Sequence, residues 1–157
     1  MSDFQCDIRF PACWAFSAKS DLLAAGNYDG DVVLCDLARR RVLNKWRAHK
    51  NIAFAVALSP DGKTLATGGG DQLIHLWDVK TLERLSTLRG HRNEVWALAF
   101  SPDGQTLASA SKDGTVKLWN GVPQPEKPEM AQAKAPLWFS PDGKTFLAAD
   151  TDNSVRY

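Results

Sequence analysis

The sequence predicts an all-β protein built from about four copies of one antiparallel unit. Three observations lead to this prediction. The tetrapeptide Ser-Pro-Asp-Gly begins at Ser59, Ser101 and Ser140, at spacings of 42 and 39 residues, and periods of this length are typical of repeat architectures. Leu-Trp at Leu76 and at Leu118 keeps the same 42-residue period. Between these markers short apolar runs alternate with turn residues, which indicates strands rather than helices.

The elements of one unit follow in order from its residue types. Residues 95–100 are all apolar, which is typical of a strand buried on both faces. Pro-Asp-Gly then predicts a tight turn, because proline presets φ at one corner and glycine tolerates a positive φ. We expect a second strand at 106–111, a turn at 112–114 and a third strand at 115–119, with 83–88 as the fourth strand of the preceding copy. Each copy is therefore predicted to be a four-stranded antiparallel meander.

A meander of this kind has two apolar faces, so neighbouring sheets must stack face to face to bury them. A radial stack of four-stranded sheets is a β-propeller, and the chain predicts about four blades in a single segment, 1–157. A turn-rich segment at Ser17, 42 residues before Ser59, indicates a degenerate first copy. The approximate copies are 10–49, 50–91, 92–133 and 134–157.

The last two copies depart from the full unit. Proline-rich residues 122–128 replace a fourth strand, and proline lacks the N–H that a ladder uses, so we expect a short, irregular or missing strand. The final copy stops within its third strand, which predicts a truncated last blade and an incomplete ring. Three arrangements stay open: a fragment of a longer propeller, two associated arcs, or a small closed monomer.

The unit resembles the WD-repeat family. Gly90-His91, the turn residue Asp71 and Leu-Trp-Asp from Leu76 match motifs of that family, and the resemblance spans almost the whole chain. It implies a WD-type propeller that acts as a protein–protein interaction scaffold. It also implies buried networks that join a loop histidine, a serine or threonine, a turn aspartate and a tryptophan. The residues carried over are His49, Thr67, Asp71 and Trp77 in the second copy, and His91, Ser109, Asp113 and Trp119 in the third.

These networks are expected to be structural, so the protein is not expected to be an enzyme. A Ser-His-Asp hydrolase needs one exposed nucleophile beside a base, whereas this set recurs every 42 residues. Gly-Lys-Thr at Gly62 lacks the earlier glycine of a phosphate-binding loop, and residues 68–70 are predicted to form a turn. We expect no catalytic residue, no cofactor and no metal ion.

Aromatic residues point to a candidate interaction face. Phe54 and Trp96 lie 42 residues apart at the start of the innermost strands, and aromatic anchors often dominate protein interfaces. The alternative is that both side chains pack along the central channel. The strand-to-strand loops assign eight residues to this interaction face: Tyr28, Lys50, Asn51, Phe54, Arg92, Asn93, Trp96 and Lys112.

A basic segment at 38–50 offers a second candidate, an anion patch. Lys and Arg on an outermost strand discourage edge-to-edge pairing, but clustered cations also bind phosphate backbones. The functional alternatives are therefore a nucleic-acid-associated adaptor that uses this rim, or a regulatory segment of a larger signalling enzyme. The patch consists of Arg39, Arg40, Arg41, Lys45 and Arg47.

Composition limits the partners. The chain has 19 Lys and Arg against 18 Asp and Glu, a net charge of +1, so we expect protein partners, including a second arc, rather than nucleic acid. The longest apolar run, 52–58, is too short to span a membrane. Cys6, Cys13 and Cys35 are odd in number and lack C-x-x-C spacing, so we expect reduced thiols and a cytoplasmic location.

Overall fold

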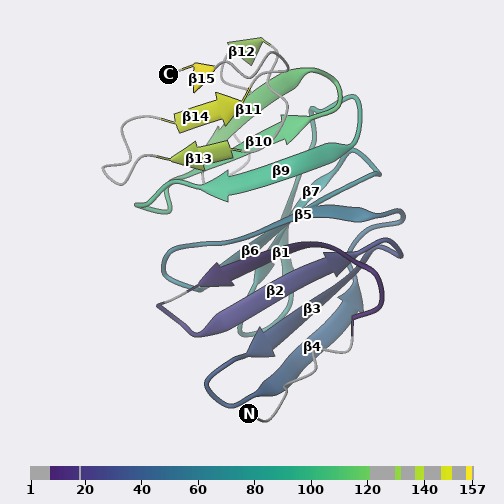
Figure 1. Cartoon of the computed structure of the whole chain (residues 1–157), viewed down its shortest axis with the longest axis vertical. Coiled ribbons are helices and arrows are strands. Elements are labelled where there is room, and N and C mark those ends of the chain that lie inside the picture. Colours follow the sequence, from purple (N-terminus) through teal and green to yellow (C-terminus); the bar gives the residue numbers. More distant parts are fainter. Residues whose placement is uncertain are drawn as a thin grey trace.

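The computed structural model describes residues 8–17 and 19–120, and the backbone of four short strands between residues 130 and 156. Every regular element in this part of the chain is a β-strand, and the strands form four antiparallel sheets (Figure 1). The prediction of an all-β protein is confirmed. No helix within the described residues is long and apolar enough to cross a membrane.

The first sheet is a meander of four strands in chain order. It consists of β1 (Pro11–Ser17), β2 (Leu22–Asn27), β3 (Asp31–Asp36) and β4 (Arg41–Arg47). The central strands β2 and β3 are buried on both faces, as expected for sheets that are covered on two sides. The outer strand β4 is largely exposed, which explains why it carries the basic residues of the sequence.

The second sheet repeats this order. It consists of β5 (Ala53–Leu58), β6 (Thr64–Gly69), β7 (Ile74–Asp78) and β8 (Arg84–Leu88). Its inner strand β5 and its central strands are mostly buried, whereas β8 is exposed at its start.

The third sheet contains β9 (Val95–Phe100), β10 (Thr106–Ser111), β11 (Thr115–Asn120) and the two-residue strand β12 (Met130–Ala131). The pairing of β11 with β12 is shorter than the pairings of the outer strands in the first two sheets, as predicted for this copy. Residues 122–128, on which that prediction was based, lie outside the described residues.

The fourth sheet has three strands in the described part of the chain. They are β13 (Leu137–Phe139), β14 (Phe146–Ala149) and β15 (Val155–Arg156), paired in chain order. The first three sheets follow one another in chain order as an open arc, so the prediction of an incomplete ring is confirmed (Figure 1).

The Ser-Pro-Asp-Gly turns close the first hairpin of the second and third sheets. Ser59 Oγ donates a hydrogen bond to Asp61 Oδ1 at 2.6 Å and accepts one from the N–H of Thr64 at 2.9 Å. Gly62 has a φ of 71°, in the left-handed region where a side chain would be strained. The motif therefore recurs because each of its positions has a distinct task in the turn.

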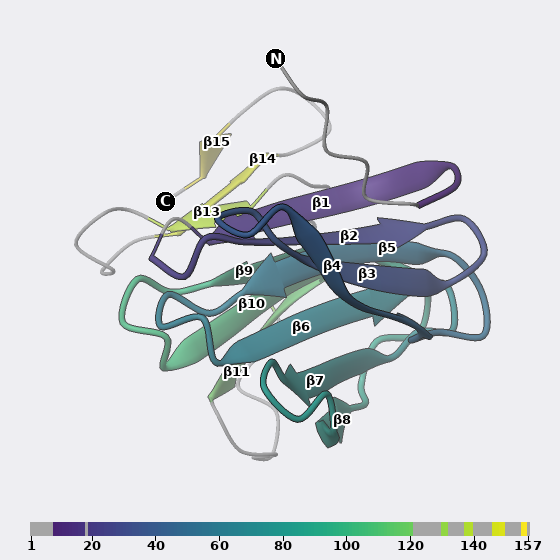
Figure 2. The ribbon, with the colours of Figure 1, turned by 90° about the horizontal axis from the view of Figure 1, so that it is seen from below.

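The sheets stack through their innermost strands. β1 lies beside β5, β5 beside β9, and β9 beside β13. Figure 2 shows the same stack turned by 90° from the view of Figure 1, with β1 and β8 on opposite sides. This succession of inner strands brings the loops of neighbouring sheets together at one face.

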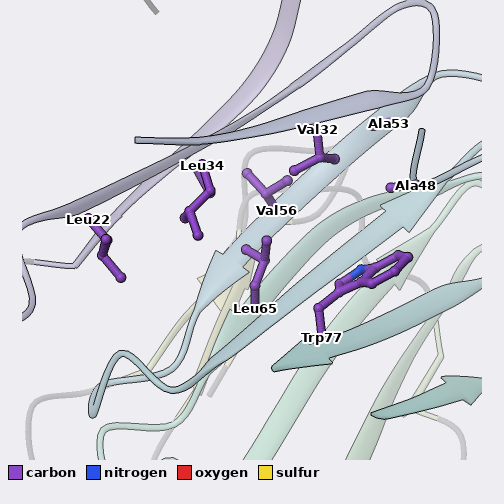
Figure 3. Close-up of a cluster of buried hydrophobic side chains, with 9 residues drawn as sticks. Leu22, Val32, Leu34, Ala48, Ala53, Val56, Leu65 and Trp77 are labelled. Carbon is purple, nitrogen blue, oxygen red and sulfur yellow. The ribbon is translucent and has the colours of Figure 1, made fainter. Parts of the chain in front are cut away.

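The main core lies between the first two sheets (Figure 3). Leu34 is fully buried, Leu65 is 1% exposed, and burying a leucine side chain contributes about 1.5 to 3 kcal/mol. Trp77 closes this core and meets Trp46 edge to face, with ring centroids 5.5 Å apart. A second core, centred on Ile74, lies between the second and third sheets.

Two sequence-based predictions are wrong in detail. Residues 68 and 69 continue strand β6 instead of forming a turn, and only Gly70 lies in the turn. Cys35 is fully buried in β3 and is disulfide-bonded, so the prediction of three reduced cysteines fails at this position. Neither feature is visible in local spacing, because both depend on neighbours that are distant in the sequence.

Candidate interaction face and its polar networks

In the second sheet, four polar side chains form one hydrogen-bonded chain. His49 Nδ1 lies 2.8 Å from Asp71 Oδ1, and His49 Nε2 lies 2.9 Å from Thr67 Oγ1. The indole N–H of Trp77 donates to Thr67 Oγ1 at 3.0 Å. With a proton on His49 Nδ1, the Thr67 hydroxyl donates to Nε2, so every donor and acceptor in the chain is paired.

The third sheet repeats this geometry with serine in place of threonine. His91 Nδ1 lies 2.9 Å from Asp113 Oδ2, and His91 Nε2 lies 2.8 Å from Ser109 Oγ. Trp119 Nε1 donates to Ser109 Oγ at 2.8 Å. Satisfied buried networks of this kind favour a single geometry, because an unpaired member costs its full desolvation.

Each network also holds a loop of the interaction face. Asp71 Oδ2 accepts the backbone N–H of Lys50 at 3.2 Å, and Asp113 Oδ2 accepts the backbone N–H of Arg92 at 2.8 Å. Burial raises the pKa of Asp71, but the hydrogen bonds from His49 and from the backbone N–H groups of Lys50 and Leu73 outweigh it and lower the pKa to about 2. Burial also raises the pKa of Asp113. The hydrogen bonds from the N–H of Arg92 and the hydroxyl of Thr115 outweigh this effect and hold its pKa below the ordinary range.

The networks do not have the geometry of an active site. Thr67 and Ser109 are 0% exposed, so neither hydroxyl can reach a substrate. Three potential metal ligands, His49, Asp71 and His75, bring their ligand atoms within 4.8 Å of one another. Both ring nitrogens of His49 already bond to protein groups, however, so a metal ion would have to break the network.

Two residues that support the network of the second sheet were not identified from the sequence. A Cβ added at Gly69 would collide with the His49 ring and lie 2.9 Å from Asp71 Oδ1. His75 stacks on His49, with ring centroids 4.9 Å apart, and its Nδ1 lies 2.9 Å from Thr87 Oγ1. Burial is the main cause that lowers the pKa of His75 to about 4, and the charge of Arg84 adds to it. Neither residue recurs with the 42-residue period, and the network residues were identified from the sequence by that period.

The structure brings four residues of the predicted interaction face together around one hollow of about 380 Å³. Tyr28, from the turn between β2 and β3, is 58% exposed beside it. Lys50 and Asn51 come from the connection between β4 and β5, and Phe54 from β5 itself. We call this space the aromatic hollow.

The other four residues of the face gather at the third sheet, and Glu94 joins the two groups. Trp96 Nε1 donates to Glu94 Oε2 at 3.0 Å. Lys112 Nζ lies 3.3 Å from the same oxygen and 5.8 Å from the centroid of the Trp96 ring. Glu94 also lines the aromatic hollow but was not predicted from the sequence. The residue 42 positions earlier, Ile52, is apolar, so the repeat did not mark Glu94 as a site residue.

Arg92 and Asn93 shape the loop before β9. The backbone N–H of Arg92 is held by Asp113, as described above, and its side chain is exposed. Asn93 accepts the N–H of Glu94 on its Oδ1 at 2.9 Å and the hydroxyl of Ser111 on its carbonyl at 3.1 Å. The loop is thereby fixed at both residues.

The residues of the predicted anion patch lie along β4 and in the turn that precedes it. Arg39 and Arg40 lie in the turn before the strand, and Arg39 Nη1 forms an ion pair with Asp36 Oδ2 at 2.9 Å. Arg41 begins β4 and Arg47 ends it. The remaining patch residue, Lys45, is exposed on the same strand.

Comparison with known proteins places these features in a family. Residues 40–78 and 82–120 match the family described as WD domain, G-beta repeat. Each match starts one or two residues before the outer strand of one sheet and ends with the third strand of the next. The solved structure of U3-55K is similar in fold, with a TM-score of 0.85 and 23% sequence identity over 98% of this chain. The chain spans about half the length of that protein, covering 50% of it, and no curated protein matched the chain.

Proposed function

Because the chain belongs to the WD-repeat family, we propose that it is a non-catalytic scaffold that binds a protein partner through the interaction face. The observation that supports this most directly is the aromatic hollow, where Tyr28 from a turn and Phe54 from β5 lie beside Lys50 and Glu94. Aromatic side chains are enriched at the centres of protein interfaces, and polar groups are typical of the surrounding rim. The burial of Thr67 and Ser109 supports the non-catalytic part of the proposal.

The proposal is tested by removing the aromatic anchors. We expect the double substitution Phe54→Ala and Trp96→Ala to weaken capture of a partner at least tenfold in an affinity pulldown with the full chain, because hot-spot aromatics often contribute 2 kcal/mol or more. Leu85→Ala is the matched control, since Leu85 is 57% exposed on β8 and does not line the aromatic hollow. Circular dichroism confirms that both variants are folded. Unchanged capture by the folded double variant would show that another surface binds the partner.

Two alternatives predict different results. A nucleic-acid-associated adaptor that uses the basic rim would bind RNA or DNA with a steep dependence on salt, but the ion pair of Arg39 with Asp36 reduces the charge available there. A regulatory segment of a larger signalling enzyme would change the rate of a catalytic domain on the same polypeptide. Neither alternative needs the aromatic residues, so the double variant separates both from the proposed scaffold.

The cytoplasmic location expected from the sequence stays a prediction. The disulfide bond at Cys35 removes part of its basis, because stable disulfides are typical of oxidising compartments. Cell fractionation of a tagged full chain tests it directly.

A further inference from the structure

A second hollow, of about 430 Å³, lies between the end of β4 and the strands β7 and β8. Its walls carry four basic side chains from two segments of the chain, 47–50 and 84–89: Arg47, Lys50, Arg84 and Arg89. We call it the basic hollow. Only Arg47 of these four belongs to the anion patch expected from the sequence, because Arg84 and Arg89 come from the neighbouring sheet.

Asp71 is the one carboxylate among the described residues that line the basic hollow, and one negative charge does not balance four cations. Asp71 already accepts hydrogen bonds from His49 on Oδ1, and from the backbone N–H groups of Lys50 and Leu73 at 3.2 and 3.3 Å. Within the part of the chain that the structure describes, the side chains of Arg84 and Arg89 make no hydrogen bond or ion pair. The basic hollow therefore has an excess of positive charge with unused N–H donors.

Arg47 is already positioned by the protein. Its Nε donates to the carbonyl oxygen of His49 and its Nη2 to that of Lys50, both at 3.3 Å. These bonds hold the guanidinium at the rim, and its remaining N–H groups stay available. Charge-assisted hydrogen bonds from guanidinium groups to carboxylate or phosphate are about twice as strong as bonds between neutral groups.

Apart from Asp71, the described residues inside the basic hollow add no negative charge. His75 is buried beside it, and Thr87 bonds to His75 Nδ1. Burial keeps the imidazole neutral near pH 7, since its pKa is lowered to about 4. Binding of an anion would relieve the mutual repulsion of the four cations.

Arg47 and Lys50 line both the aromatic hollow and the basic hollow. The two spaces are therefore neighbours that share a wall, and one extended peptide of a few residues, at about 3.3 Å per residue, can reach from one to the other. The basic hollow lies between the first and second sheets, so it does not depend on the open ends of the arc.

We propose that the basic hollow is an anion subsite of the interaction face, which binds a carboxylate or phosphate group on a peptide segment of the protein partner. This inference rests on the proposed scaffold function and specifies the chemistry of its partner. A peptide is favoured over a nucleic acid because the cations surround one concave site instead of following a track. Among the described residues, no Phe, Tyr or Trp lines the basic hollow to stack a base.

Fluorescence anisotropy with the full chain tests this proposal. The probes are a labelled Glu-rich peptide, a labelled phosphoserine peptide, its unphosphorylated form and labelled oligouridine. We expect one or both anionic peptides to bind, the unphosphorylated peptide to bind more weakly, and Arg84→Gln with Arg89→Gln to reduce anionic-peptide affinity about tenfold. The two anionic peptides distinguish carboxylate from phosphate as the source of the charge.

The matched control is Lys63→Gln with Lys80→Gln, which removes the same net charge from exposed turn positions outside the basic hollow. An equal loss of affinity in both double variants would overturn the proposal, because it would show binding to net charge alone. Failure of both anionic peptides to bind at low salt, or oligouridine binding that depends on Arg84 and Arg89 in place of peptide binding, would also overturn it.

Failure of the anion subsite can be distinguished from failure of the scaffold proposal. If partner capture depends on Phe54 and Trp96 but no anionic peptide binds, the subsite is wrong and the scaffold proposal stands. If anionic peptides bind through Arg84 and Arg89 but partner capture is unaffected by the aromatic variant, the interaction face is wrong.

Discussion

The hydroxyl of Thr67 shows how much of each sheet depends on single atoms. It receives the indole N–H of Trp77 and bonds to His49, so one oxygen links the core to the loop that precedes β5. A valine here would have nearly the same volume, but it would leave two buried polar groups unpaired, at a cost of about 1 to 3 kcal/mol each. Shape alone therefore does not determine this position.

The acid dependence of stability should report on the turn aspartates. The pKa of Asp71 is lower in the folded protein, about 2, than its ordinary value of 3.8, so its contribution is present above pH 4. As the pH falls from 4 to 2, we expect the free energy of unfolding to decrease by about 1 to 2 kcal/mol from this group, after allowance for solvent screening. Urea unfolding at a series of pH values measures it.

Asp71→Asn is the matched variant for this experiment. Its free energy of unfolding should be lower at pH 6 and should decline less between pH 4 and 2 than that of the unmodified protein. Parallel pH profiles for the two proteins would contradict the assignment of a charged, hydrogen-bonded Asp71 in the folded state.

At the residue scale, the sequence was informative where residues recur and uninformative where they do not. The 42-residue period places His, Ser or Thr, Asp and Trp at equivalent positions, and the structure joins each set by hydrogen bonds of 2.8 to 3.0 Å. Gly69, His75 and Glu94 have no periodic equivalents, and their roles arise from contacts across strands and sheets. A pattern search along the chain does not register such contacts.

Strand β6 illustrates how an element is adapted to its network. It ends in Gly68 and Gly69, two residues with low β-propensity, yet both remain in the strand. A Cβ at Gly68 would lie 2.8 Å from Val95 of the next sheet, and one at Gly69 would collide with His49. The strand therefore lacks side chains where its neighbours approach most closely, which is why the three glycines suggested a turn from sequence alone.

We expect Gly69→Ala to destabilise the protein by about 1 to 3 kcal/mol, because the added methyl group displaces His49 from Asp71. Thermal or urea unfolding measures the change. Gly70→Ala is the control, since its added Cβ lies 3.2 Å from Asn51 Cβ and touches no network atom, and it should cost less.

A double-mutant cycle sharpens this test. In a His49→Ala background the collision is removed, so Gly69→Ala should have a much smaller effect than in the unmodified protein. Additive effects of the two substitutions would show that Gly69 acts through backbone flexibility and not through the histidine.

For the whole molecule, the exposed aromatic residues of β1 are the feature with the largest consequence. Trp14 is 73% exposed and Phe16 is 52% exposed, and both lie on the same face of the first sheet because strand residues two apart share a face. They pair across the strands with Ala25 and Leu23, which belong to a small apolar cluster in which Ala25 and Val33 are buried. The sequence predicted an incomplete ring but could not show which side chains it leaves exposed, since that depends on how the first sheet faces its neighbours.

We expect the chain to self-associate in a concentration-dependent manner and to bind a hydrophobic dye, because exposed apolar patches of this kind favour association. Trp14→Thr with Phe16→Thr keeps residues that suit a strand and should reduce both effects. Analytical ultracentrifugation and dye fluorescence measure them. A compact, monodisperse monomer of the unmodified chain that binds no dye would contradict this expectation, and with it both the fragment and the paired-arc arrangements.

The hydrogen bonds from Asp71 to the N–H of Lys50 and from Asp113 to the N–H of Arg92 link fold and recognition. Each carboxylate faces a buried histidine on one side and a binding loop on the other. The loops that present the interaction face are thus anchored by the same groups that hold the sheets in shape. For a scaffold that binds through this face, as proposed, we expect changes of specificity at the side chains of these loops, because changes to their backbone would disturb the hydrogen bonds that anchor them.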